Sequence, residues 1–201
     1  MKRIDRFYLY LTWPKYLAQW YAHEMFRVGN FEKETEPPFQ YDCRVAVEDL
    51  EPVQTQRGSA ERCIIEYYLS KQPDVIPEKA PKDATICIEI PSFLGKPTEY
   101  YNYLPDAGKS LLLNTARVHF RKNLVKYMNK VWFADKVIRS GYMVTREKLI
   151  EGFMLANGIE YDDVNYESVA KVWSRIEGAY RGVEFRKRKR EIANNNENTR
   201  D

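Results

Sequence analysis

Few residues of this sequence combine the type and spacing that catalysis requires. His23 and Glu24 are neighbours, but successive residues of a helix point about 100° apart, so we expect a satisfied surface pair. His119 stands between Val118 and Phe120, which is typical of a packed or surface histidine rather than a general base. No nucleophile is spaced to meet a base, and we therefore expect that the protein is not an enzyme.

The segment Gly108-Lys109-Ser110 matches the last residues of a phosphate-binding loop that precedes a helix. Such a loop needs a glycine five residues before its final glycine, so that backbone N–H groups can surround a phosphate. That position is Tyr103. We therefore interpret the segment as the start of a helix with Asp106 as its cap, and we expect no cofactor.

The cysteines Cys43, Cys63 and Cys87 are odd in number and widely spaced. Together with only two histidines, they predict neither a disulfide framework nor a zinc site, and buried free thiols are the simpler interpretation. No basic start precedes a long apolar run, and the apolar stretches are far shorter than the roughly 20 residues that span a bilayer. We expect a cytoplasmic protein that does not contact a membrane.

The residues best suited to bind a partner are cationic and lie in the second half of the chain. Residues 1–106 contain 13 Lys and Arg against 17 Asp and Glu, whereas residues 107–201 contain 19 against 12. The total charge of +3 therefore hides a negative first half and a strongly positive second half. No acidic residue lies between Asp106 and Asp135. A nucleic acid or an acidic protein would be drawn to this half.

Within the acid-free stretch, Lys122, Lys126 and Lys130 recur four residues apart and would line one side of a helix. Like charges at this spacing repel slightly, and bound phosphates would reverse that cost. The alternative is a solvated face that is balanced by the acids of the first half. The candidate phosphate contacts are Arg117, Arg121, Lys122, Lys126 and Lys130, with the terminal cluster Arg186, Lys187, Arg188, Lys189 and Arg190.

The last two expected helices could form a helix-turn-helix unit, because each has an apolar stripe for packing on the other. On the second helix, Asn165, Lys171 and Arg175 share a face away from that stripe. Asn and Arg can read adenine and guanine edges through paired hydrogen bonds, so these three are candidate base contacts. The long connection over Asn157–Asp162 and the acids near it argue instead for a plain helical hairpin.

The pattern of expected helices and strands predicts one α+β domain over residues 1–181, and this domain would position the candidate residues. Its sheet-containing part, residues 1–106, should form a small antiparallel or mixed sheet with helices packed on it. The expected strands are Phe7–Trp13, Tyr41–Val47 and Thr85–Ile90, and the expected helices are Pro14–Arg27 and Ala60–Lys71. Residues 31–40 and 72–83 should be loops, because they are rich in proline and charge.

The second part of the domain, residues 107–181, shows helical periodicity throughout. We expect one helix or two in tandem over Ala107–Arg139, a break at Ser140-Gly141, and a helix over Arg146–Ala156 that Thr145 caps. Asn157-Gly158 should end that helix, and the last one should run from Asp162 or Asp163 to about Arg181. Residues 182–201 form a basic and then Asn/Glu-rich tail, which we expect to be disordered.

Three short segments resemble a pattern in uncharacterised proteins of bacterial prophages and integrated mobile elements. They are Tyr16-Leu17-Ala18-Gln19-Trp20, Tyr101-Asn102-Tyr103-Leu104, and Asn157-Gly158-Ile159 with the helix after it. The resemblance implies a phage or mobile-element setting, where DNA-binding and assembly proteins are both frequent, and it assigns no catalytic residue.

Two functions remain open at this point. The first is a nucleic-acid-binding protein that contacts phosphates through the basic helix and the tail. The second is a structural or assembly protein whose tyrosines meet another protein or a second copy of the chain. The tyrosines in question are Tyr8, Tyr10, Tyr100, Tyr101 and Tyr103.

Overall fold

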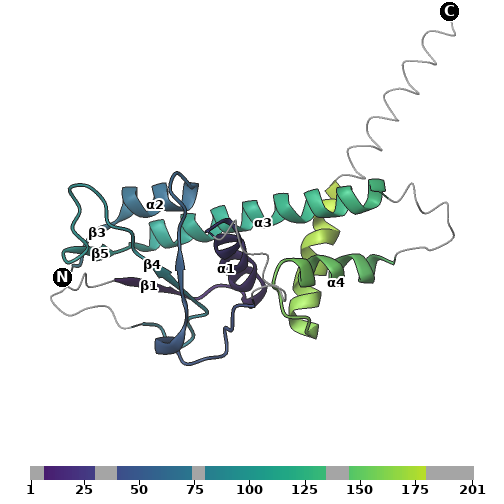
Figure 1. Ribbon diagram of the computed structural model, residues 1–201, viewed down its shortest axis with the longest axis horizontal. Helices are drawn as coiled ribbons and strands as arrows, with labels where there is room; N and C mark the ends of the chain where they lie inside the picture. Colours follow the sequence, from purple (N-terminus) through teal and green to yellow (C-terminus); the bar gives the residue numbers. More distant parts are fainter. Residues whose placement is uncertain (1–6, 30–39, 74–79, 135–144, 180–201) are drawn as a thin grey trace, which may run out of the picture.

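The computed structural model of the chain describes residues 7–29, 40–73, 80–134 and 145–179. It is elongated, with a small sheet toward one end and paired helices at the other (Figure 1). The helix α3 (Asp106–Ala134) runs along both parts and joins them. The expected α+β fold, with a sheet-containing first part and a helical second part, is confirmed.

The sheet is mixed and has three strands in the order β1 (Tyr8–Leu11), β4 (Ile86–Glu89) and β2 (Pro52–Gln54). The central strand β4 is antiparallel to β1 and parallel to β2. Leu9 and Leu11 are buried whereas the tyrosines that alternate with them are half-buried, so β1 turns its apolar face to the core.

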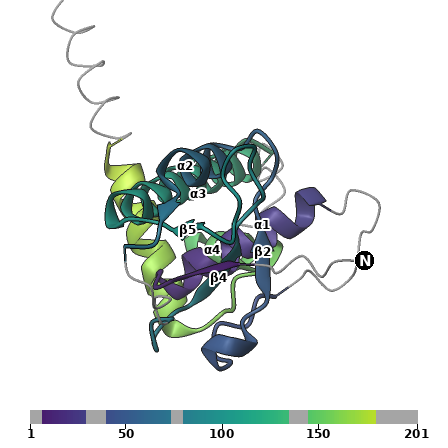
Figure 2. The same cartoon turned by 90° about the vertical axis from the view of Figure 1, so that its left-hand side faces the viewer.

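A second, two-stranded ribbon pairs β3 (Ser70–Lys71) with β5 (Tyr101–Tyr103) in antiparallel register. The helix α2 (Ala60–Tyr68) leads into β3, and Ser59 caps it by accepting a hydrogen bond from the Arg62 N–H at 3.1 Å. Figures 1 and 2 both show α2 lying along the first half of α3.

The core is continuous between the two parts of the chain. The helix α1 (Lys15–Gly29) presents Trp20 to α3, where the Trp20 and Phe120 ring centroids lie 5.4 Å apart. On its other side, Phe120 meets Phe153 of α4 (Arg146–Ala156) at 5.7 Å. One aromatic side chain of α3 therefore links α1 to α4, and both aromatic pairs have the edge-to-face geometry that rings prefer.

The helical bounds follow local signals that the sequence displays. The Thr145 hydroxyl accepts a hydrogen bond from the Lys148 N–H at 3.3 Å, and Gly158 adopts φ +64° just beyond the end of α4. The last helix covers residues 163–179, and the Asp162 carboxylate caps it by accepting from the Asn165 N–H at 2.7 Å. The predicted ends of α4 and the predicted start of the last helix are confirmed.

The predicted strand over Tyr41–Val47 is wrong. The Asp42 carboxylate accepts a hydrogen bond from the Arg44 N–H at 2.9 Å, which closes a turn, and a single 3₁₀ turn follows over Val47–Asp49. The strand β2 instead lies where we expected a loop. The predicted helix over Ala60–Lys71 ends early at Tyr68, because the next residues pair with β5.

Two smaller expectations for α3 are also decided. It is one continuous helix as far as Ala134, and Asp106 lies inside its first turn rather than capping it, since the Pro105 carbonyl already accepts from the Lys109 N–H at 2.9 Å. The predicted break at Ser140-Gly141, the loop at residues 31–39 and the tail at 182–201 lie outside the described residues. No helix of the described part is long and apolar enough to cross a membrane.

Candidate nucleic-acid interface

The cationic face is the set of basic side chains on α3 that the sequence selected as phosphate contacts. Its members are Arg117, Arg121, Lys122, Lys126 and Lys130. The side of α3 opposite the three lysines is buried at Ala116, Phe120, Leu124 and Met128, which recur every four residues, and the two arginines lie nearer to this buried side. This packing fixes the rotation of the helix, so the four cations from Arg121 onward are exposed and Arg117 is half-buried.

The cationic face is not neutralised within the described part of the chain. None of its five members has a described carboxylate within salt-bridge distance, and Arg117 contacts only the Asn114 side-chain oxygen, at 3.5 Å. By contrast, Lys15 lies 2.7 Å from Glu160 and 2.9 Å from Asp162. The ion pairs of the described part therefore lie elsewhere, and none of them neutralises a side chain of the cationic face.

Arg175 of the last helix adds to this charge at Tyr16. The Tyr16 ring packs edge-to-face on Phe120, with centroids 5.1 Å apart. Burial raises the pKa of the Tyr16 phenol, and three guanidinium groups, those of Arg117, Arg121 and Arg175, partly offset that rise through their positive charge. The charge of Arg175 therefore acts on the same phenol as the charges of Arg117 and Arg121.

Asn165 does not lie on an open face, and that part of the prediction is wrong. Its side chain is 1% exposed, and its amide nitrogen donates to the Gln19 side-chain oxygen at 3.2 Å and to the Glu160 carbonyl at 3.0 Å. The start of the last helix is therefore packed on α1. A recognition helix inserts this end into the major groove, so the helix-turn-helix interpretation loses its proposed adenine contact.

Lys171 is exposed as predicted, but it has a local counter-ion. Its ammonium lies 2.8 Å from the Glu167 carboxylate one turn earlier, and that hydrogen bond lowers the pKa of Glu167. Its charge is therefore less available to phosphate than those of the cationic face. The terminal cluster Arg186–Arg190 lies outside the described residues.

A buried polar junction that the sequence did not reveal holds the last helix against the rest of the protein. At its centre, the Gln19 side-chain oxygen accepts from the Glu160 N–H at 3.1 Å, and its nitrogen donates to the Tyr41 carbonyl at 3.3 Å. Gln19 is 3% exposed. No local pattern could mark this residue, because its partners Tyr41, Glu160 and Asn165 are 22, 141 and 146 positions away.

The two histidines are placed differently from each other. His23 is 6% exposed, so the expected surface pair with Glu24 is wrong for the histidine. His119 is 40% exposed in its side chain and lies 2.8 Å from the carboxylate of Glu61, which is 1% exposed. The negative charge of Glu61, after burial, helps to raise the pKa of Tyr21. The exposed edge of His119 thus lies against a carboxylate that is shielded from solvent.

The interpretation of Gly108 as part of a helix, rather than of a phosphate loop, agrees with its packing. A Cβ atom at Gly108 would lie 2.8 Å from Leu104 Cδ1 and 2.9 Å from Tyr68 Cβ. The glycine therefore permits the close approach of α2 to α3. Lys109, next to it, lies 3.9 Å from Asp106 and over the Tyr103 ring at 5.7 Å.

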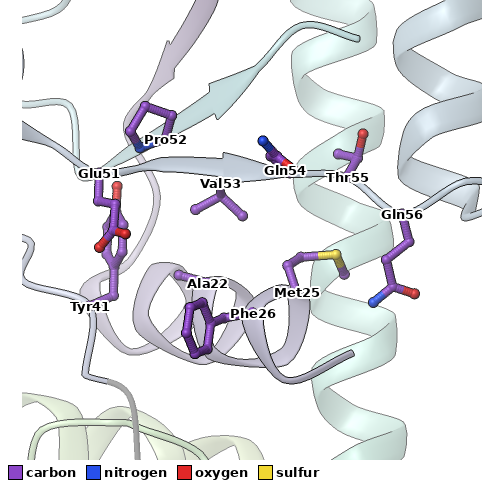
Figure 3. Close-up of a pocket in the computed structure, with 10 residues that line it drawn as sticks. All are labelled: Ala22, Met25, Phe26, Tyr41, Glu51, Pro52, Val53, Gln54, Thr55 and Gln56. Carbon is purple, nitrogen blue, oxygen red and sulfur yellow. The ribbon is translucent and has the colours of Figure 1, made fainter. Parts of the chain in front are cut away.

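A cleft of about 390 Å³ lies between α1 and β2 (Figure 3). Ala22, Met25 and Val53 supply apolar walls, and its ionisable lining groups are Glu51 and Tyr41. The Tyr41 hydroxyl accepts from the Cys87 N–H at 3.2 Å, and burial holds its pKa far above the usual range. These two groups give the cleft no pair of acid and base for catalysis.

Within the described residues, no three His, Cys, Asp or Glu side chains come together to hold a metal ion. The cationic face with Arg175 is therefore the feature of the described surface with the clearest chemistry, namely attraction of anions. Comparison with known proteins leaves the resemblance to prophage proteins a prediction, because no family model, no curated protein and no solved structure matches the chain.

Proposed function

We propose that the protein binds nucleic acid through the phosphate backbone, without catalysing a reaction, and that the cationic face and Arg175 make the contacts. One observation carries the proposal: five cations stand on one rigid helix without a described carboxylate partner. A polyanion would replace their mutual repulsion with attraction and release its own condensed counter-ions. A phage or mobile-element setting, as the resemblance implies, would suit such a protein.

The dimensions of α3 suit a short stretch of nucleic acid. Arg117 to Lys130 spans about 20 Å at the helical rise of 1.5 Å per residue, which is the length of about six base pairs of duplex at 3.4 Å each. Six cations, counting Arg175, would give a plot of log affinity against log salt a slope of about −5 on duplex DNA if each met one phosphate.

A salt titration of the full chain against a 20-base-pair duplex tests this proposal. Replacing Lys122, Lys126 and Lys130 together with Gln should weaken binding for every sequence and flatten the salt slope by about 3 units. A matched control replaces three exposed cations outside the face, Arg57, Lys71 and Lys148, with Gln and changes the net charge equally. Absence of binding at low salt both to this duplex and to a single strand of the same length, or equal losses in the two triple variants, would refute the proposal.

A second candidate function is assembly with another protein, and three exposed apolar side chains favour it. Leu94, Tyr67 and Tyr100 are 104%, 79% and 63% exposed, and all three lie near the end of the molecule where α2 stops. Of the five tyrosines that the sequence suggested, Tyr100 is exposed and the other four are half-buried. Sedimentation equilibrium would show self-association that weakens in a Leu94→Ser, Tyr67→Ser variant, and a strictly monomeric chain without protein partners would remove this candidate.

A further inference from the structure

The aromatic cleft is a small hollow between β1, β5 and the first turn of α3. The residues that give it chemical character are Tyr8, Tyr10, Asn102, Tyr103 and Lys109, and its volume is about 130 Å³. They come together because β5 lies beside β1, and α3 starts three residues after β5 ends. The Lys109 ammonium lies 5.7 Å from the centroid of the Tyr103 ring, so the cleft is aromatic and carries a cation.

The size of the aromatic cleft restricts what it can hold. Pockets for drug-sized ligands measure roughly 300 to 1,000 Å³, so a hollow of this volume has room for one small planar group and little more. Phenol rings offer flat apolar surfaces for stacking, and the Asn102 amide offers both a donor and an acceptor. A single nucleobase has these complementary properties, because it is planar and carries donors and acceptors on its edge.

The position of the aromatic cleft connects it with the proposed phosphate contacts. Lys109 and the cationic face belong to the same helix, and Lys109 precedes Arg117 by eight residues, or about 12 Å of helical rise. A nucleic-acid strand that follows α3 would therefore pass the aromatic cleft close to its first phosphate contact. A base can enter such a hollow only when it is unpaired, since bases inside a duplex are stacked and hydrogen-bonded to their partners.

We infer that the aromatic cleft takes one unpaired base of a single-stranded nucleic acid whose phosphates lie along the cationic face. This inference rests on the proposed function and makes it more specific, because phosphate contacts alone do not distinguish single strands from duplexes. Stacking on the tyrosines supplies the preference for a single strand, and the Asn102 amide supplies contacts to the base edge.

The test compares three probes of equal length with the full chain: a single-stranded oligonucleotide, the same strand as a duplex, and an abasic single strand that keeps the phosphates. Loss of one stacked base costs about 1 to 3 kcal/mol, so the intact single strand should bind about 5- to 150-fold more tightly than the abasic one. A 2-aminopurine base in the intact strand should lose fluorescence on binding.

Substitutions of two tyrosines that line the aromatic cleft test whether the difference in affinity arises there. Tyr103→Leu and Tyr8→Leu each remove one ring from the lining of the cleft and should each weaken binding to the intact strand, but not to the abasic strand or the duplex. Tyr103→Phe keeps the ring and should bind as the parent does. Because the probe comparison needs no substitution, it remains decisive if a variant fails to fold.

The outcomes separate this inference from the proposed function. Equal affinity for intact and abasic strands, or a preference that survives both leucine substitutions, would overturn the inference and leave phosphate binding in place. Failure to bind any of the three probes at low salt would refute the proposed function, and the inference with it.

Discussion

Replacing Asn165 separates its structural role from a role in reading DNA. If the side chain contacted bases, Asn165→Ala would weaken DNA binding and leave stability unchanged. The structure predicts the reverse order of effects, because the amide nitrogen donates to the Gln19 side-chain oxygen, the Glu160 carbonyl and the Asp162 carboxylate, all within 3.2 Å. Asn165 is 1% exposed, so water cannot replace these contacts without opening the junction.

The expected magnitude follows from the hydrogen bonds that each substitution removes. An amide has two N–H donors, and each buried hydrogen bond contributes about 1 kcal/mol, so Asn165→Ala should lower the free energy of unfolding by about 2 kcal/mol. Asn165→Asp keeps the shape but directs a carboxylate at three acceptor oxygens. An uncompensated buried charge costs about 3 to 5 kcal/mol, so this near-isosteric change should be the more damaging.

Urea denaturation followed by circular dichroism measures both losses of stability. The matched control is Ser168→Ala on the same helix, because Ser168 is half-buried and makes no side-chain hydrogen bond in the described network. Heat denaturation should show a midpoint lower by about 4 to 8 °C for Asn165→Ala, at about 2 to 4 °C per kcal/mol for a chain of this size. An Asn165→Ala variant with unchanged stability and selectively weakened DNA binding would refute the reasoning.

Three further predictions concern the packing, pH dependence and thiols of the fold. Gly108→Ala should destabilise the protein by about 1 to 3 kcal/mol in urea, because the new methyl group meets Tyr68 Cβ, whereas Gly152→Ala meets only the Tyr127 hydroxyl and should cost less. Burial alone would raise the pKa of Asp162, but the hydrogen bonds from Lys15, Asn165 and Val164 together with the Lys15 charge outweigh it and lower the pKa, so the contribution of Asp162 to stability is present above about pH 4 and is lost as the pH falls through the folded-state value. Asp162→Asn keeps the cap, and it should cost more stability at pH 6 than at pH 2. At pH 8, a thiol reagent should label exposed Cys63 first, because burial raises the pKa of Cys43 to about 12 and that of Cys87 to about 11; rapid labelling of all three would contradict the described packing.

The predictions from sequence that were confirmed depend on signals within a few residues. Thr145 and Gly158 mark the two ends of α4 through their own hydroxyl and backbone conformation, and the four-residue period of α3 fixes its buried side. The strand β2 has three residues and depends on pairing with β4, more than thirty positions away, so no local pattern reveals it. The segment Tyr41–Val47 shows that a local pattern can also mislead. Its alternating pattern predicts a strand, but a hydrogen bond to the Asp42 side chain forms a turn instead.

The same distinction explains which candidate site residues could be identified. Lys122, Lys126 and Lys130 were placed correctly on an exposed side, since a helix that buries one face must present the other. Asn165 was misplaced because its environment depends on Gln19, 146 positions away, and helical spacing alone cannot show that α1 covers this end. The combined effect of the Arg175, Arg117 and Arg121 charges on the Tyr16 pKa is likewise a product of tertiary packing.

The buried and exposed sides of α3 have different roles. Its buried side joins the sheet to the paired helices through Phe120, so substitutions there should affect stability throughout the molecule. Its exposed side contributes little to packing, and its like charges should slightly destabilise the free protein. Neutralising Lys122, Lys126 and Lys130 should therefore preserve or slightly increase stability while it weakens nucleic-acid binding. If the cationic face served only folding, the same substitutions would lower the free energy of unfolding and leave nucleic-acid binding unchanged.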